Sequence, residues 1–144
     1  MKEEHLAFIQ ALKTNGIAVF ELTDVLKNAP LEALKAIAQQ LSSADISQMD
    51  KEELIDRIIV GAPLRGIYFM RDQSITTPRG QVIGKMKLPH RQLEPALIRL
   101  CYEWLGRKVA YEVQADGACL EGGDYIPFNT IAFIGEEFMW KCFG

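Results

Sequence analysis

Seven residues in the middle of the chain, Gly66-Ile-Tyr-Phe-Met-Arg-Asp72, carry β-branched and aromatic side chains and end on two opposite charges. This composition predicts a strand that delivers the charged pair at its end. Residues 74–80, which close on Thr-Pro-Arg-Gly, are typical of a turn, and residues 81–86 then form the returning strand. The sequence therefore predicts a hairpin at the start of its central region.

Downstream of this hairpin, Pro89 and Pro95 bracket the entry of a helix that runs to residue 105 and ends at Gly106. Residues 109–113 have the composition of a further strand, and residues 125–134 that of a second hairpin turning at Asn129. The predicted order after residue 67 is strand, strand, helix, strand, strand, strand. The class is α/β.

Upstream of the hairpin, apolar residues recur at helical spacing, which predicts a helix over 3–14 and further helices through residues 28, 41 and 60. Residues 17–22, Ile-Ala-Val-Phe-Glu-Leu, are β-branched and aromatic and predict one buried strand. Residues 1–61 are thus expected to be mainly helical, and residues 62–144 to carry the strands, within a single domain.

Composition limits the classes of function. The chain has 144 residues, a net charge of −3, 49% hydrophobic and 24% charged residues, which suits one globular domain. Mild acidity argues against non-specific binding of nucleic acid, and no apolar run approaches the ~20 residues that span a bilayer. The acidic start does not resemble a signal peptide, so we expect a cytoplasmic protein without nucleic-acid or membrane partners.

Cysteine and histidine are sparse. Cys101, Cys119 and Cys142 form no Cys-x-x-Cys pair, and His5 and His90 lie far apart in the sequence. This spacing predicts neither a disulfide framework nor a zinc site, and we expect no metal and no cofactor. Cys101 falls in an apolar helical stripe, which indicates a core position.

Charged residues from three separate segments could converge at one rim of the sheet. Asp72 ends a predicted strand, Arg91 follows nineteen residues later, and Glu121 precedes two glycines. Two carboxylates can clamp the edges of a planar guanidinium, and an arginine can bind a ligand carboxylate by the same geometry. Glycines let the backbone approach a ligand closely. The pattern predicts a receptor for a small ligand with a cation at one end and an anion at the other.

Each motif also has a plainer interpretation. Arg71 and Asp72 alone are typical of a surface salt bridge, and Arg91 with Glu94 is typical of an exposed pair on a helix. Residues 122–124, Gly-Gly-Asp, are common in ordinary turns. Only the combination of the three motifs favours a site.

The combination resembles the arginine deiminase family of guanidino-group-modifying enzymes. That family has a Phe-x-Arg-Asp strand, an Arg-x-x-Glu stretch nineteen residues after the Asp, and a Leu-Glu-Gly-Gly-Asp motif. The matching residues here are Phe69, Asp72, Arg91, Glu94 and Glu121. The resemblance runs from about residue 3 to Gly135 and implies a partial α/β propeller, pentein-like, of about two ββαβ units.

The resemblance also implies an activity, hydrolysis of the guanidino group of L-arginine or a related compound to the ureido product and ammonia. It implies catalytic roles for Asp72 and Glu121, and substrate binding by Phe69, Asp72, Arg91 and Glu121. It implies structural support from Arg71, Glu94, Gly122, Gly123 and Asp124.

The chain departs from the family pattern in two respects. Gly66 stands where the family usually has an asparagine that contacts the amino-acid end of the substrate, and the family's His-x-Asp and C-terminal cysteine motifs are absent. Cys119 lies two residues before Glu121, but the matching family position is not catalytic. We therefore expect a shortened chain with incomplete activity alone, or a non-catalytic guanidino-binding or assembly remnant.

Assembly is the last expectation. A closed five-fold propeller has no free unit interfaces, whereas about two units would expose apolar faces of the kind that recruit partners. The tail Phe138-Met-Trp-Lys-Cys-Phe143 adds three aromatic residues. We expect a homo-oligomer, with a complementary C-terminal chain as a further possible partner.

Overall fold

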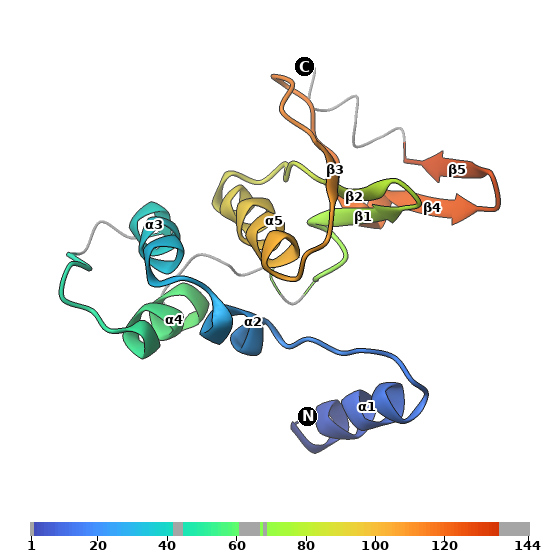
Figure 1. The fold of residues 1–144 in the computed structure, drawn as a ribbon. Helices are drawn as coiled ribbons and strands as arrows, with labels where there is room; N and C mark the ends of the chain where they lie inside the picture. The colour runs from blue at the N-terminus through green and yellow to red at the C-terminus, as the bar shows by residue number, and fades with distance from the viewer. Residues whose placement is uncertain (1, 42–44, 61–66, 68, 136–144) are drawn as a thin grey trace.

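The protein is described from a computed structural model, which places residues 2–41, 45–60, 67 and 69–135. Two parts are visible in Figure 1, a helical part formed by the first sixty residues and a second part that contains all of the strands. A long helix, α5 (Leu93–Trp104), lies between them. No helix in the described residues is long and apolar enough to cross a membrane.

The helical part contains α1 (Lys2–Thr14), α2 (Leu22–Asn28), α3 (Leu31–Leu41) and α4 (Lys51–Val60). Helix α4 begins with a capping box, in which the Asp50 N–H donates to Glu53 Oε2 and the Glu53 N–H donates to Asp50 Oδ1, both at 2.9 Å. Helix α1 stands apart from the other helices in Figure 1, at the end of an extended stretch of chain. The tight packing therefore begins at α2.

The strands form two small sheets. In the first, β1 (Ser74–Thr77) pairs antiparallel with β2 (Gly80–Ile83), and β2 pairs parallel with β3 (Val109–Glu112). The parallel pairing is possible because α5 makes the crossover between β2 and β3. The second sheet is the antiparallel hairpin of β4 (Tyr125–Phe128) and β5 (Ile131–Ile134).

The main hydrophobic core joins the two parts through α5. Leu26, Leu34, Leu54 and Ile58 are fully buried on the three packed helices, and Leu97 meets them from α5. Buried residues recur at the three- and four-residue intervals that align side chains on one helix face, at 34, 37 and 38 on α3 and at 54, 55 and 58 on α4. The helical periodicity of the sequence therefore fixes which face of each helix turns inward, and α5 anchors the helices to the sheet.

Most of the predicted elements are confirmed. The helices expected over 3–14, through residues 41 and 60, and up to 105 correspond to α1, α3, α4 and α5. The second hairpin and the strand at 109–113 also form as expected. A mixed α/β fold is therefore shown, and the described residues contain one ββαβ unit followed by a hairpin.

Two predicted strands are wrong. Residues 17–21 form no strand, and α2 begins at Leu22, because a strand needs a ladder partner and the sheets lie at the other end of the molecule. The first strand of the central hairpin is β1, within residues predicted to be a turn. Residues 69–73 form turns instead, and positions 66 and 68 of the predicted strand lie outside the described residues.

The error in the central hairpin has a physical cause. Thr76 and Thr77 are β-branched and suit a strand, and only Pro78 and Arg79 are needed to make the turn before Gly80. Gly80 has a φ of +130°, which side-chain-bearing residues rarely adopt. The sequence therefore predicted the turn correctly but made it too long: the turn consists of Pro78 and Arg79, and the threonines before it belong to β1.

Candidate functional site

A short 3-10 turn, η1 (Pro89–Arg91), and the start of α5 position the centre of the candidate site. Proline at the first position of η1 presets the backbone for a helical turn. Arg91 ends this turn, and Glu94 follows three residues later in the first turn of α5, so both side chains project from one side. Arg91 is 9% exposed and Glu94 is fully buried.

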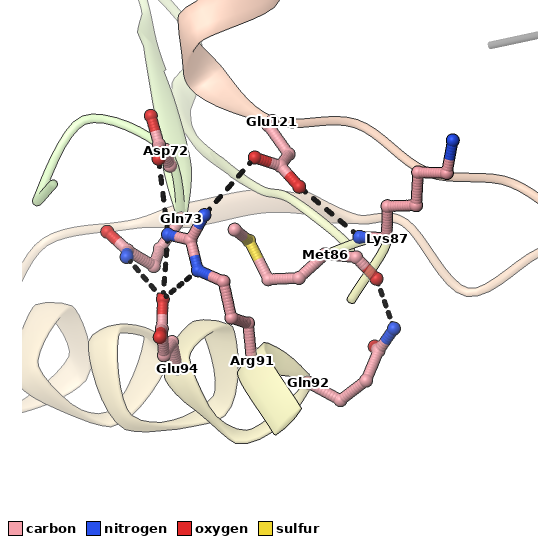
Figure 2. A network of polar contacts seen from close by, with 8 residues as sticks. All are labelled: Asp72, Gln73, Met86, Lys87, Arg91, Gln92, Glu94 and Glu121. Carbon is pink, nitrogen blue, oxygen red and sulfur yellow. Dashed lines mark hydrogen bonds and ion pairs between the residues drawn. The ribbon is translucent and has the colours of Figure 1, made fainter. Parts of the chain in front are cut away.

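The guanidinium of Arg91 contacts three carboxylates (Figure 2). Its Nε and Nη2 donate to Glu94 Oε2 at 3.0 and 2.9 Å, and Nη2 also donates to Asp72 Oδ2 at 3.1 Å. Its Nη1 reaches Glu121 Oε2 at 3.4 Å. The structure thus brings Asp72, Arg91, Glu94 and Glu121 together from three separate segments.

Asp72 and Glu121 reach the cluster because two turns pack against each other at one end of the first sheet. The Gly122 N–H donates to the Asp72 carbonyl at 2.7 Å, and a Cβ at Gly122 would lie 1.8 Å from the Arg71 carbonyl oxygen. Only glycine fits such a contact. The carboxylate of Glu121 can therefore lie beside that of Asp72 only because residue 122 is a glycine.

Electrostatics stabilise the charged form of Arg91. Burial acts to lower the pKa of this guanidinium, but the hydrogen bonds that it donates to Glu94 and Asp72 and the negative charges of Glu94 and Glu121 outweigh this effect. The pKa of Arg91 is therefore raised above its ordinary value. Because the cluster contains one guanidinium and three carboxylates, it has an excess of negative charge and attracts a further cation.

The plainer interpretation of Arg91 and Glu94 as an exposed helix pair is wrong, because both side chains are buried. The interpretation of Arg71 and Asp72 as a salt bridge is wrong as well. Arg71 is exposed and donates to the Tyr125 carbonyl at 2.9 Å, whereas Asp72 pairs with Arg91. The Arg71 contact ties the turn before β1 to the start of β4.

The other predicted site residues lie around the cluster. Phe69 is 64% exposed, and its carbonyl accepts a hydrogen bond from the Asp72 N–H at 2.9 Å. Gly123 is exposed, and a Cβ there would lie 3.3 Å from Asp72 Oδ1. The Asp124 N–H donates to the Glu121 carbonyl and closes the 3-10 turn η2 (Gly122–Asp124). Their roles toward a ligand stay predictions.

Several contacts in the network were not predicted from the sequence. Gln73 is fully buried and donates from Nε2 to Glu94 Oε2 at 2.8 Å. The backbone N–H of Lys87 donates to Glu121 Oε1 at 3.3 Å, and the Gln92 side chain donates to the Met86 carbonyl. The only sequence feature that pointed to Gln73 was its position directly after Asp72. The contact of the Lys87 backbone N–H could not be predicted, because every residue type except proline carries this donor.

A hollow of about 320 Å³ borders this network. Its lining includes Met86, Lys87 and Gln92, which belong to the network, and the segment 117–119. A volume of this order accommodates a small molecule. Among the described residues, no group of three His, Cys, Asp or Glu side chains is arranged to hold a metal ion.

The cysteines differ in what the structure allows. Cys101 is buried in the main core, as expected, and burial raises the pKa of its thiol to about 12. A thiol with such a pKa is neutral at physiological pH and is a poor nucleophile. Cys142 lies outside the described residues.

Comparisons with known proteins agree with the motifs. A family model described as arginine deiminase matches residues 32–135, a range that contains every predicted site residue. The sequence is also 23% identical over 172 residues to an arginine deiminase from Metamycoplasma arthritidis (strain 158L3-1). That similarity covers 92% of this chain and 42% of the relative, so the chain spans less than half the length of the relative.

Proposed function

This chain belongs to the arginine deiminase family, and we propose on that premise that Asp72 and Glu121 bind the guanidinium group of L-arginine or a related guanidino compound. The matched region contains both carboxylates. The family membership supports the class of ligand, and the charge cluster supports the place where it binds.

One observation carries the proposal, namely that Asp72 and Glu121 already flank a guanidinium. They contact Nη2 and Nη1 of Arg91 from different segments of the chain. Carboxylates at this spacing can hold the same planar, permanently charged group when it belongs to a ligand. The Arg91 contacts support the proposal that the two side chains bind a guanidinium group.

A ligand must share these carboxylates with Arg91. Glu121 uses both oxygens, one toward Arg91 and one toward the Lys87 N–H, whereas Asp72 Oδ1 has no hydrogen-bond partner in the described part of the chain. We propose that the ligand guanidinium binds at Asp72 Oδ1 first and that Glu121 then exchanges Arg91 for the ligand. Arg91 stays hydrogen-bonded to Glu94, and we propose that it then binds the carboxylate of an arginine-like ligand.

In the proposed reaction the guanidino carbon is attacked by a thiolate and ammonia leaves after protonation. Water then hydrolyses the amidino-thioester to the ureido product and releases the thiol. Asp72 and Glu121 hold the cation and stabilise its charge during these steps. Cys101 does not supply the thiolate, because its thiol is buried and protonated. Cys119 does not supply it either, because its sulfur is disulfide-bonded. We propose that this 144-residue polypeptide binds the ligand and that turnover needs a thiolate and an acid from elsewhere.

The finer fold and the location belong to the same proposal. The ββαβ unit formed by β1, β2, α5 and β3 is the repeating unit expected for a partial α/β propeller, and the β4–β5 hairpin would begin a second unit. We propose a cytoplasmic site of action, where free arginine-like substrates are available.

Calorimetric titration of the purified chain with L-arginine tests the binding. We expect saturable binding, weakened at least tenfold by Asp72→Asn or Glu121→Gln, because each substitution removes a charge from the guanidinium clamp. Asp116→Asn, an exposed aspartate outside the cluster, is the matched control and should bind like the unaltered chain. L-citrulline, whose ureido group is uncharged, should bind far more weakly than L-arginine.

A citrulline-release assay separates the two forms of the proposal. Binding without citrulline supports a guanidino-binding protein, and citrulline formed only after addition of a complementing chain supports a shared active site. Equal binding of L-arginine by the Asp72→Asn, Glu121→Gln and control variants, with all three folded by circular dichroism, would overturn the assignment of the site.

A further inference from the structure

Arg91 fills the position that a guanidinium ligand would need. Figure 2 shows its guanidinium between Glu94, on α5, and the carboxylates of Asp72 and Glu121. Its Nη2 lies 3.1 Å from Asp72 Oδ2, and its Nη1 lies 3.4 Å from Glu121 Oε2. Two guanidinium groups cannot occupy the same space between these carboxylates. A ligand that binds both Asp72 and Glu121 therefore competes with the protein's own arginine.

The contacts of Arg91 with the three carboxylates divide into a firm set and a looser set. Glu94 Oε2 accepts hydrogen bonds from Nε at 3.0 Å and from Nη2 at 2.9 Å, and Glu94 follows Arg91 closely in the sequence. Asp72 and Glu121 each accept one bond from Arg91, at a longer distance and from a different segment of the chain. Hydrogen bonds between ionised groups are strongest at about 2.7–2.9 Å. Arg91 is therefore anchored by Glu94, and a ligand can replace its contacts with the other two carboxylates.

Burial follows the same division. The Glu94 side chain is fully buried, whereas the side chains of Asp72 and Glu121 are 21% and 16% exposed. A ligand from solvent therefore reaches Asp72 and Glu121 and does not reach Glu94. While the ligand takes over the two outer carboxylates, Glu94 still binds Arg91 from the buried side.

The exchange of one guanidinium for another gains little by itself. A ligand that offers only a guanidinium makes with Asp72 and Glu121 the contacts that Arg91 loses. Arg91 is 9% exposed, and a buried ion that loses its partners is costly. A ligand that also carries an anionic group gives Arg91 a new partner, so the exchange leaves no charge uncompensated. A site of this kind selects its ligand partly by a penalty on the wrong one.

We propose that Arg91 is a specificity-determining residue, an internal competitor that excludes simple guanidinium ions and admits guanidino compounds that carry an anionic group. This inference rests on the proposed function, because it takes Asp72 and Glu121 as the guanidinium site, and it adds the class of ligand that the site rejects. The apparent affinity of a ligand falls with the fraction of molecules in which its site is open. Removal of the competitor should therefore open the site to simple guanidinium ions.

Two variants remove the competitor in different ways. Arg91→Lys keeps a positive charge beside Glu94, but a single ammonium group lacks the planar fork that contacts Asp72 and Glu121 together. Arg91→Met combined with Glu94→Gln removes a buried charge and its partner at once, which leaves neither ion unpaired. The matched control is Arg99→Met combined with Glu103→Gln, which removes an exposed ion pair of the same helix. Circular dichroism shows which variants are folded, and Arg91→Lys decides the test if the double variant is not.

Calorimetric titration with methylguanidinium chloride tests the proposal. The unaltered chain and the control should bind this ion at least tenfold less tightly than they bind L-arginine. Arg91→Lys and the double variant should bind methylguanidinium at least tenfold more tightly than the unaltered chain does, and addition of Asp72→Asn should abolish this gain. N-methylurea, which has a similar shape and no charge, should bind to none of these proteins.

The outcomes separate this inference from the proposed function. If the unaltered chain binds L-arginine through Asp72 but the folded variants gain no affinity for methylguanidinium, the guanidinium site stands and the internal competitor is refuted. If the variants gain methylguanidinium binding through Asp72 while the unaltered chain does not bind L-arginine, the competitor stands and the choice of L-arginine fails. Equal affinities of the unaltered chain for L-arginine and methylguanidinium would also overturn the inference.

Discussion

The helical core and the charge cluster are both buried, yet different interactions hold them. The core between α2, α3, α4 and α5 is made of apolar side chains alone, whose burial is stabilising wherever it occurs and has no preferred direction. The cluster buries Arg91 and Glu94, which are stable in the interior only because each faces an oppositely charged partner. The comparison teaches that a truncation in the core costs stability in proportion to the apolar volume removed, whereas a truncation in the cluster also leaves a buried charge without its partner.

The cluster also differs from the core in what it can do. Apolar packing leaves nothing for a polar ligand to bind, whereas Asp72 keeps a carboxylate oxygen without a partner in the described part of the chain. The same buried charges that make the cluster sensitive to substitution make it the place where a cation is recognised. Stability and binding therefore have different sources in the two regions, and the following substitutions separate them.

The largest loss of stability is expected for Glu94→Ala. This change removes a fully buried carboxylate that accepts from Arg91 and Gln73, and it leaves the guanidinium short of a partner. We expect the free energy of unfolding to fall by about 3–5 kcal/mol, measured by urea titration. Glu103→Ala, also on α5 but in an exposed pair with Arg99, should cost less than about 1 kcal/mol. Equal losses in both variants would contradict the special status of the cluster.

In the helical core, Leu54→Ala should destabilise the protein by about 2–5 kcal/mol, because the side chain is fully buried and its removal leaves a cavity. Val60→Ala on the same helix should change the free energy of unfolding by no more than about 0.5 kcal/mol, since Val60 is 81% exposed. Neither change touches the charge cluster, so L-arginine binding should survive in whatever fraction remains folded. Lost binding in folded Leu54→Ala would show that the two regions are coupled.

Cys101 links the core to pH. Its pKa is about 12 in the fold and near 9.0 when exposed, so the unfolded chain loses the thiol proton first as pH rises. The stabilisation is complete below pH 9 and is lost as pH rises toward 12, by up to ~1.4 kcal/mol per pH unit. The stability difference between the unaltered chain and Cys101→Ala should therefore shrink above pH 9. A difference that stays constant from pH 8 to pH 10.5 would contradict the buried, neutral thiol.

The smallest effect concerns the start of α4. Asp50→Ala removes the side chain that accepts from the Glu53 N–H and should lower the free energy of unfolding by about 1 kcal/mol. Asp56→Ala, at an exposed position within the same helix, should not destabilise the protein. Thermal melts of the two variants suffice for this comparison, and a larger loss in Asp56→Ala would refute the capping role.

Prediction from sequence succeeded where the signal is local. Leu54 and Ile58 lie four residues apart on an apolar stripe, and both are fully buried on α4. The residues that meet in the cluster could be predicted because each belongs to a sequence motif. Which of them form ion pairs with one another could not be predicted. Nothing local indicates that the guanidinium between Asp72 and Glu121 belongs to Arg91, or that Gln73 completes the network.

The two wrong strands show the limit of the same reasoning. Residues 17–22 have the composition of a strand, but no strand in the described part of the chain pairs with them. The threonines of β1 stand next to turn-forming residues, yet they pair with β2. A helix satisfies its backbone within itself, so periodicity alone determined α3, α4 and α5 in this chain. A strand and a buried ion cluster satisfy their polar groups only across segments, so tertiary structure alone decided where β1 begins and which carboxylates surround Arg91.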